Sequence, residues 1–548
     1  MPRDMRPLDV LRLYPEHDYT LPGAIASRLS RRGDRPFLMF GERRWSWRDF
    51  ADAAASLAGA LGARGIAAGD RVAIVERNSD SHVVLVAALA RLRAIMVPSN
   101  PDFGVDELAY VLGHAEPKAV VAGREVVGTV CQALAKADGG AGARPAPILA
   151  GNGEGGDGRV TLFDLIEEGA RAPAPDPAAA QPDDTLVIIY TSGTTGFPKG
   201  VMHSQRNFLL AGEAFVQRVH LTPDDRAMIL LPFYHMNALF YSLAGTVAAG
   251  ASMVVVPRFS ASTFWQTAAD SGATEVNIIE AVGTILAVRP RSEYRAGHRL
   301  RAVYGVRENV AETFKSEFGI NDLLGGYGMT EIPGVTCNPL GVARRAGSMG
   351  PVGRHPDPAR QWARCRVVGE DGRDVADNEV GELWVQTPIV MQGYLRDPEQ
   401  TRAAFENGWF KTGDLVRRDE DGWFYFVSRR TDIIRRRGEN IAGAELDRVI
   451  GAHPDVLEAA AIAVPAELGE DEILVAVVTR DGRELAPRDI AAWCRERLSP
   501  AKVPRFVVFL DALPHTPTHK VAKNALRGDA SLRERAADLA PAHGQPQS

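Results

Sequence analysis

Hydrophobic and polar positions alternate along residues 20–125 in a pattern that predicts strands and helices in turn. Short apolar runs are typical of strands buried on both faces, and the longer segments between them repeat apolar residues at helical spacing. The predicted strands are 71–75, 94–97 and 119–122, and the predicted helices are 47–65, 81–93 and 105–112. This alternation predicts a parallel sheet covered by helices on both faces, and it resumes from Leu186 to about residue 324.

Three later stretches have a different pattern. Residues 139–184 are rich in Gly, Pro and Ala, which predicts a loose connection with one short helix at 162–168. Residues 347–427 consist of short apolar runs and turn signals, as expected of a small antiparallel barrel or sandwich. Beyond Asp432 the pattern predicts a compact α+β module. Its expected elements are a helix at 444–450, strands at 457–464 and 473–479, a helix at 488–498 and a strand at 506–509.

The predicted fold class is therefore α/β, with a large N-terminal domain and a small C-terminal domain. We expect the large domain, residues 1–428, to contain two α/β sheet subdomains and a small β-barrel. Their expected bounds are about 1–180, 181–346 and 347–428. A hinge at 429–432 would join this domain to a small mobile α+β domain at 433–548, because that module has its own pattern and follows an arginine-rich junction.

One loop suits a polyphosphate better than any other part of the chain. It follows the predicted strand 186–190 and combines glycines, hydroxyls and one ammonium group. Glycines allow several backbone N–H groups to point at one anion, and the hydroxyls and the lysine add further donors. The spacing is not that of a Walker loop, and a flexible surface loop is the simpler alternative. The candidate residues are Thr191, Ser192, Gly193, Thr194, Thr195, Gly196 and Lys199.

A second candidate lies where a predicted strand ends. The sequence Tyr327-Gly328-Met329-Thr330-Glu331 follows an apolar pair and two glycines, and open α/β sheets bind ligands at strand ends. Thr330 can donate to a phosphate, and Glu331 can hold Mg²⁺ against phosphate oxygens. A surface turn explains the same residues equally well.

Three further positions carry weaker signals. Asp414 is expected in a tight turn, where its carboxylate can accept two ribose hydroxyls. His235 lies in an apolar passage, where a core histidine is the usual explanation, and Lys520 lies in a loop near the end of the chain, where most lysines only keep a protein soluble.

Composition narrows the class of protein. The formal net charge is -6 and the pI is about 6.1, which argues against a nucleic-acid-binding protein. The four cysteines lie far apart without metal-ligand spacing, and no secretory segment is visible at the N-terminus, so we expect a cytoplasmic protein with reduced thiols. The uncharged stretch 227–257 is interrupted by Pro232, His235 and glycines, so we expect a buried strand–loop–helix–strand passage and no membrane span.

Taken in order, these motifs resemble the adenylate-forming (AMP-binding) superfamily, which includes the acyl-CoA synthetases. The phosphate loop, the His235 passage, YGMTE, TGD, SRRTDIIRRRGEN and LPxTxxxK follow one another over nearly the whole chain. The resemblance implies that ATP and Mg²⁺ convert a carboxylic acid to acyl-AMP with release of pyrophosphate, and that CoA then displaces AMP. An acid–CoA ligase is the leading hypothesis.

The resemblance also assigns roles to residues. The loop 191–199 would hold the β- and γ-phosphates, Thr330 and Glu331 the α-phosphate and Mg²⁺, and Asp414 with Arg429 the ribose. Lys520 would bridge the acid and the α-phosphate. The small domain would then rotate and present its other face to CoA. The residues expected at the catalytic centre are Lys520, Thr330, Glu331 and His235, and those expected at the nucleotide or CoA include Tyr327, Asp414, Arg429, Gly438 and Glu439.

Three departures from the family pattern limit what can be transferred. Residues 304–309 lack the usual adenine loop, the hinge position is Thr431, and His519 precedes the lysine where glycine is common. The missing adenine loop and the RRRGEN run most resemble the crotonobetaine/carnitine–CoA ligase branch of the family.

The acid itself stays open at this stage. The acyl pocket expected from the resemblance is mostly apolar, with candidates Tyr234, Met236, Phe240, Val282 and Val335. A small or medium acid fits, including one with a cationic head against aromatic rings. Two alternatives to the CoA ligase are an enzyme that loads a carrier protein and a nucleotide-binding protein with a decayed site. The oligomeric state also stays open, a homodimer being one possibility.

Overall fold

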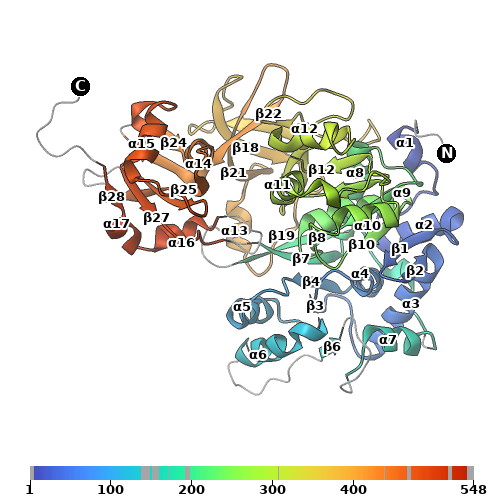
Figure 1. Ribbon diagram of the computed structural model, residues 1–548. Coiled ribbons are helices and arrows are strands. Elements are labelled where there is room, and N and C mark those ends of the chain that lie inside the picture. The colour runs from blue at the N-terminus through green and yellow to red at the C-terminus, as the bar shows by residue number, and fades with distance from the viewer. Residues whose placement is uncertain are drawn as a thin grey trace, which may run out of the picture.

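The computed structural model describes residues 5–137, 148–150, 159–171, 173–191, 198–306, 308–436, 439–465, 471–515 and 521–539. Figure 1 shows a large body built from the first three quarters of the chain, with the orange and red C-terminal domain at one side of it. Among the described helices, none has both the length and the apolar character that crossing a bilayer requires.

The first sheet carries the strands that lead to the phosphate loop. Its order is β19-β8-β7-β4-β3-β5-β6, parallel from β7 to β6 and antiparallel at β8 and β19. The strands are β3 (Arg71–Val75), β4 (Ile95–Ser99), β5 (Ala119–Ala122), β6 (Ile148–Ala150), β7 (Thr185–Thr191), β8 (Lys199–Ser204) and β19 (Gly393–Tyr394). The expected stop of β4 before Pro98 is wrong: Pro98 pairs with Ile74 of β3, while pairing of β4 with β7 is confined to Met96.

The second sheet lies beside the first, in the order β13-β12-β11-β9-β10-β1-β2, and only β2 runs antiparallel to its neighbour. The strands are β1 (Pro36–Phe40), β2 (Arg43–Ser46), β9 (Arg226–Ile229), β10 (Ser252–Val255), β11 (Glu275–Asn277), β12 (Ala302–Tyr304) and β13 (Asp322–Leu324). The two sheets therefore interleave in sequence, since β1 and β2 precede the first sheet and β7 and β8 follow the loose connection. A boundary near residue 180 does not separate the sheets.

Helices cover both sheets because the strand residues alternate between two apolar faces. Ala73 and Val75 pack with Leu108 and Leu134 of α5 and α6. Their neighbours Val72 and Ile74 face the large core that α3, α4 and α8 share with the second sheet. The helices are α1 (Pro7–Leu11), α2 (Leu21–Arg32), α3 (Trp47–Ala63), α4 (Asp80–Leu92), α5 (Val105–Ala115), α6 (Val127–Ala137), α7 (Leu162–Gly169), α8 (Gln205–Val219), α9 (Ala244–Ala249), α10 (Phe264–Ser271), α11 (Glu280–Val288) and α12 (Glu308–Ser316).

A small antiparallel sheet follows, as the change of pattern after residue 347 predicts. Its order is β16-β22-β21-β18-β17, and β20 pairs with β21. The elements are β16 (Ser348–Gly350), β17 (Arg364–Val368), β18 (Val380–Gln386), α13 (Pro398–Ala403), β20 (Phe405–Glu406), β21 (Trp409–Arg418) and β22 (Phe424–Arg429). A hairpin of β14 (Gly326–Met329) and β15 (Ile332–Cys337) links it to the second sheet.

The C-terminal domain has the helix–strand–strand–helix–strand order that its sequence predicts. Its sheet, β25-β26-β27-β28, has an apolar cluster on each face. The elements are β23 (Ile433–Arg436), β24 (Glu439–Ala442), α14 (Gly443–Gly451), β25 (Val456–Pro465), β26 (Asp471–Thr479), α15 (Pro487–Arg495), β27 (Phe506–Phe509), α16 (Lys523–Gly528), α17 (Ser531–Arg535) and β28 (Ala537–Asp538).

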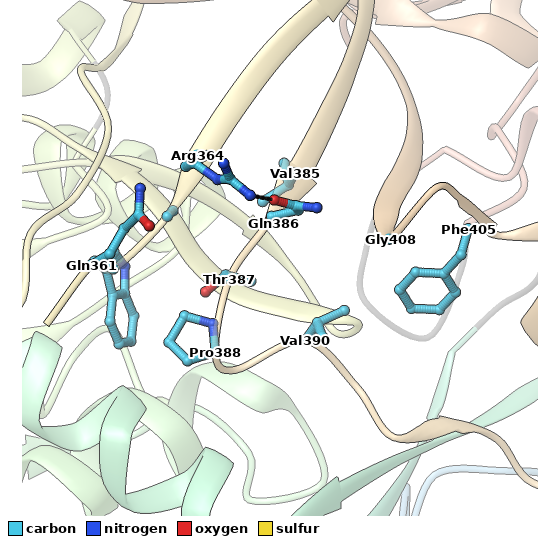
Figure 2. Close-up of a pocket in the computed structure, with 11 residues that line it drawn as sticks. Gln361, Arg364, Val385, Gln386, Thr387, Pro388, Val390, Phe405 and Gly408 are labelled. Carbon is cyan, nitrogen blue, oxygen red and sulfur yellow. Dashed lines mark hydrogen bonds between the residues drawn. The ribbon is translucent and has the colours of Figure 1, made fainter.

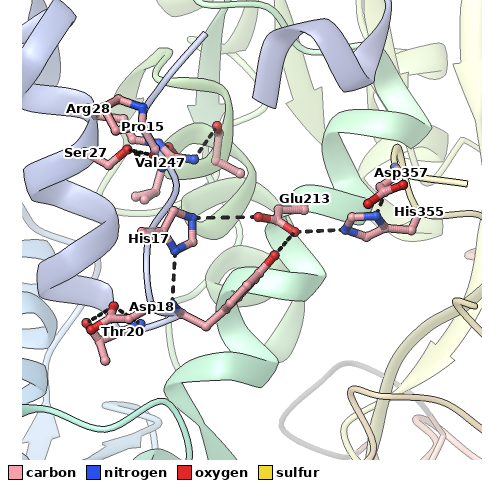
Figure 3. A network of polar contacts seen from close by, with 12 residues as sticks. Pro15, His17, Asp18, Thr20, Ser27, Arg28, Glu213, Val247, His355 and Asp357 are labelled. Atoms are coloured by element: carbon pink, nitrogen blue, oxygen red, sulfur yellow. Dashed lines mark hydrogen bonds and ion pairs between the residues drawn. The ribbon is translucent and has the colours of Figure 1, made fainter. Parts of the chain in front are cut away.

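A buried polar network fixes α8, the helix that runs between the sheets. Glu213 of α8 is 5% exposed and accepts hydrogen bonds from Tyr19 (3.2 Å) and from Nε2 of His355 (2.9 Å). His17 approaches the same carboxylate at 3.8 Å. Figure 3 shows this carboxylate between the N-terminal segment and the segment before β17. Two parts of the chain that are distant from α8 in sequence therefore hold this helix in place.

A second buried carboxyl group, Glu275 of β11, gives a prediction about stability. Neither of its oxygens meets a donor among the described residues, and burial raises its pKa to about 8. The folded protein therefore keeps a proton that the unfolded chain loses near its ordinary pKa, so Glu275 lowers stability as the pH rises between those two values, by about 1.4 kcal/mol per pH unit.

Glu275→Gln should therefore raise the melting temperature relative to the parent protein at pH 7.5 and change it little at pH 5. Calorimetry at both values measures the difference. An equal shift at the two pH values would contradict the assignment of a protonated carboxyl group.

Candidate functional site

The two ends of the phosphate loop are fixed by a hairpin. Strands β7 and β8 pair antiparallel, with Thr191 opposite Lys199. The apolar residues of β7 are buried on both faces, as its sequence predicts. Residues 192–197 lie outside the described part of the chain, so the expected roles of Ser192, Gly193, Thr194, Thr195 and Gly196 stay predictions.

Glu331 lies at the centre of the arrangement, in the turn between β14 and β15. It is 7% exposed, and burial raises its pKa, whereas the Tyr394 hydroxyl and the charges of Arg429 and Lys199 act to lower it. Tyr394 donates to its Oε1 at 3.0 Å, and the Lys199 ammonium lies 5.0 Å from the centre of the Tyr394 ring. The end of the phosphate loop and the carboxylate of YGMTE are thus brought to one place by Tyr394.

Tyr394 was missed by the sequence analysis. It belongs to the two-residue strand β19, which pairs with β8 opposite Val201. No local pattern distinguishes it, because its role depends on this pairing across nearly two hundred residues. The backbone N–H of Met391 adds a second link from the same segment, to the carbonyl oxygen of Glu331 at 2.8 Å.

His203 holds the backbone of Thr330 and was also missed, although it ends the quoted phosphate-loop stretch. Its Nε2 lies 2.6 Å from the Thr330 carbonyl oxygen, and Asn207 lies 3.1 Å from its Nδ1. Burial lowers the pKa of His203 to about 4, so the ring is neutral. A neutral ring can donate from Nε2 to the carbonyl oxygen and accept from Asn207 at Nδ1.

Tyr327, Asp414 and Arg429 form the second group. The Tyr327 hydroxyl donates to Oδ2 of Asp414 at 2.5 Å, and Nε of Arg429 lies 3.3 Å from Oδ1. Asp414 is 3% exposed, whereas the Arg429 side chain is 45% exposed. The two residues stand opposite each other on β21 and β22. A buried carboxylate is thus held between a tyrosine hydroxyl and a half-exposed guanidinium.

The expected tight turn at Asp414 is wrong. Asp414 lies inside the ten-residue strand β21, in which Gly413 has φ +71°. The turn signals of Thr412-Gly413-Asp414 instead produce an irregular strand, since the pairing register of β21 shifts against both β18 and β22. Glu382 accepts the Gly413 N–H at 3.0 Å and fixes this irregularity.

The structure leaves the roles of the remaining candidates untested. Lys520 and Gly438 lie outside the described residues, and Glu439 is described only as the first residue of β24. His235 is partly buried, and its ring centre lies 4.5 Å from that of Tyr234. Their roles stay predictions. Of the expected acyl-pocket residues, Phe240, Val282 and Val335 are buried core residues.

One surface pocket lies away from these groups. A pocket of about 350 Å³ opens where β17 starts and β18 ends. The residues that line it include Trp362, Arg364, Gln386, Pro388 and Phe405. Figure 2 shows Arg364 bonded to Gln386 above the apolar floor of this pocket. None of the candidate residues named above lines this pocket, so the polar groups described above form a separate site.

Comparison with known proteins identifies the family of the chain. The AMP-binding enzyme family matches residues 25–395, and the AMP-binding enzyme C-terminal domain matches residues 445–520. A sulfoacetate–CoA ligase of Cupriavidus necator is 34% identical over 95% of this chain and 99% of its own length. A crotonobetaine/carnitine–CoA ligase of Salmonella enteritidis is 29% identical over 84% of this chain and 89% of its own.

A solved structure gives the same result for the fold. ATP-bound MatB from Rhodopseudomonas palustris superposes with a TM-score of 0.81 at 29% identity, covering 93% of this chain and 98% of that one. The similarity extends over both domains, and the relatives named above are acid–CoA ligases. The chain therefore belongs to the AMP-binding enzyme family and spans both its large domain and its C-terminal domain.

Proposed function

We propose that the protein is an AMP-forming acid–CoA ligase, with the two groups around Glu331 and Asp414 as its nucleotide site. The observation that supports this most is the meeting of Lys199, Asp414 and Arg429, on three different strands, with Glu331 in the turn between β14 and β15. Two cations and two carboxylates suit a nucleotide, because the phosphates need positive charge and the ribose hydroxyls need hydrogen-bond acceptors.

The first half-reaction places two anions against each other. The substrate carboxylate attacks the α-phosphorus of ATP, a new C–O–P linkage forms, and the bond to the β-phosphate breaks with release of pyrophosphate. Lys199 and the loop before it are proposed to hold the departing phosphates. Lys520 is proposed to lie between the carboxylate and the α-phosphate, where a fixed cation stabilises the redistributed charge.

Glu331 is the residue proposed to hold Mg²⁺. Its carboxylate is buried and has an oxygen not engaged by Tyr394, and no group of three or more His, Cys, Asp or Glu suited to a metal exists in the described part of the chain. A single carboxylate fits Mg²⁺, which usually binds one or two carboxylates together with substrate phosphates. When bound, the ion neutralises phosphate charge.

The second half-reaction transfers the acyl group to CoA. The thiol sulfur attacks the acyl carbon, the thiol loses its proton, a C–S bond forms and AMP leaves. Residues around Gly438 and Glu439 are proposed to meet the pantetheine arm after the C-terminal domain rotates, since glycine leaves room for a narrow chain.

The direct test measures pyrophosphate release from ATP across a panel of carboxylic acids, followed by thioester formation with free CoA. Acid-dependent release with both steps supports the proposal. Release with transfer only to a carrier protein would favour that acceptor instead, and no release with any acid would refute the ligase. The names of the relatives do not select the acid, because they include both sulfoacetate and crotonobetaine.

Tyr394→Phe tests whether the Tyr394 hydroxyl keeps the Glu331 carboxyl group ionised. Loss of the hydroxyl removes a bond that lowers the pKa of Glu331, so that pKa rises further and the ionised form becomes scarcer at low pH. We expect kcat/KM for ATP to fall about 10-fold at pH 6.5 and less at pH 8.5. Tyr425→Phe is the matched control, because Tyr425 makes a similar 2.9 Å bond to Asp419 away from the site. A loss independent of pH would contradict this role.

Lys520→Ala separates the two half-reactions. Adenylation should slow by about 10²–10³-fold, whereas thioester formation from supplied acyl-AMP should be retained. Lys502→Ala is the control, since Lys502 is also in the C-terminal domain and pairs with Glu445. Equal losses in both half-reactions would remove Lys520 from the adenylation step.

Gly438→Leu should impair thioester formation and leave adenylation largely intact, the reverse of Lys520→Ala. A bulky side chain in the proposed pantetheine path should slow thioester formation much more than pyrophosphate release. Gly451→Leu serves as its control, because a Cβ at Gly451 meets only open space. Unchanged turnover with CoA would show that Gly438 does not line the path.

A further inference from the structure

Arg218, on the last turn of α8, is a buried cation whose hydrogen bonds are incomplete. It is 4% exposed. Its Nη2 donates to the carbonyl oxygen of Gly334, while Nε and Nη1 meet no acceptor among the described residues. A buried charge with missing partners is costly, and such groups are normally paired and hydrogen-bonded.

No neighbour supplies the missing negative charge. None of the ion pairs formed by the described residues includes Arg218. The guanidinium lies 5.1 Å from the centre of the Tyr241 ring, and its other neighbours are Tyr304 and Cys337. These are neutral groups, since burial raises the pKa of the Cys337 thiol to about 11 and that of both phenols above the ordinary value.

Arg28 shows how the same fold satisfies a buried arginine. It is 2% exposed, and its guanidinium donates to the carbonyl oxygens of Val247 (3.1 Å) and Ala248 (3.0 Å) and to the Ser27 hydroxyl (3.3 Å). Glu213 also acts on it electrostatically. Arg28 is therefore a structural arginine. Arg218 differs from it because two of its nitrogens, Nε and Nη1, meet no acceptor among the described residues, and no ion pair of the described residues includes it.

Arg218 lies against β15, the strand that directly follows Glu331. A Cβ on Gly334 would clash with Nη2 of Arg218, so only glycine lets the guanidinium reach β15. The Tyr241 and Tyr304 hydroxyls meet β14 in the same way, 2.9 Å and 2.8 Å from a Cβ built on Gly328 and Gly326. A cationic and phenolic cluster thus lies directly against the hairpin that carries Glu331.

We infer that Arg218 receives a second anionic group of the acid substrate, which makes the substrate class a short carboxylic acid that carries a further carboxylate or sulfonate. This inference rests on the proposed ligase function. The guanidinium has two nitrogens ready for oxygen acceptors, and charge-assisted bonds to carboxylate or sulfonate oxygens are the strong kind. An arriving anion supplies both the missing acceptors and the missing charge.

The length of the acid follows from the strand. Gly334 is three residues beyond Glu331, a distance of about 10 Å along an extended chain. An acid that reaches from the nucleotide to Arg218 therefore has few carbons. A cationic head, one of the options left open by the sequence, would meet a like charge at this position and is disfavoured.

The first experiment uses the parent protein. Pyrophosphate release is measured with malonate and sulfoacetate, and with the uncharged-ended analogues monomethyl malonate and propionate. We expect kcat/KM to be at least about 100-fold higher for the two-charged acids, because a site with buried polar groups rejects an analogue that leaves them unpaired. The better of malonate and sulfoacetate identifies the second group.

The second experiment uses Arg218→Met and Arg218→Lys, with Arg28→Met as the matched control. Arg218→Met should abolish the preference by weakening the two-charged acids at least about 100-fold while retaining the others, and Arg218→Lys should keep part of it. Arg28→Met should lower the melting temperature and leave the ratio of kcat/KM values unchanged.

The outcomes separate this inference from the proposed function. Efficient release with propionate or monomethyl malonate and no preference for a second charge would overturn the role of Arg218 and leave the ligase intact. A uniform loss for all acids in Arg218→Met would likewise assign Arg218 a purely structural role. No release with any acid would overturn the ligase, and the inference with it.

Discussion

The burial of Glu331 is the constraint on which the rest of the site depends. A carboxylate in the protein interior is stable as an anion only where donors and positive charge compensate for lost water. Here the compensation comes from Tyr394, Lys199 and Arg429, which belong to three separate strands. The hairpin that carries Glu331 is therefore stable in this position only when the first sheet and the small antiparallel sheet are both assembled around it.

The backbone of the same turn is held by a residue whose charge state follows from burial. His203 is fully buried and neutral, and it links the Thr330 carbonyl oxygen to Asn207 of α8. A charged ring could not accept from Asn207, so burial and hydrogen bonding select one arrangement. The turn is thus fixed at Thr330 through His203 and Asn207 of α8, and at Glu331 by Tyr394.

Much of the fold follows from local pattern, and the site follows from it only in part. The strands 71–75, 119–122 and 506–509 agree with β3, β5 and β27, because short apolar runs between turn signals have few other interpretations. The interleaving of the two sheets could not be predicted, since pairing partners distant in sequence leave no local trace. The same reason explains why Tyr394 was missed.

Asp414 illustrates a different limit. Glycine flanked by polar residues predicts a turn, yet the pairing of β21 with two neighbours keeps the chain extended and converts the turn signal into a register shift. Residue type and order were enough to propose Asp414 as a ribose ligand, which stays a prediction, whereas its hydrogen bond from Tyr327 could be seen only in the fold. The chemical role of a side chain can thus be proposed from the sequence more easily than the contacts that set its position and its pKa.

The two buried arginines show why an incomplete interaction is informative. Both lie near α8 and both are excluded from water, so each pays for the loss of hydration. Arg28 recovers this cost from carbonyl oxygens, whereas Arg218 leaves two nitrogens without acceptors, a deficit of about 1–3 kcal/mol for each unsatisfied group. The rest of the fold carries this deficit in the free protein. An anion bound at Arg218 would remove it, so the same term that lowers the stability of the free protein favours an acid with a second charge over one without it.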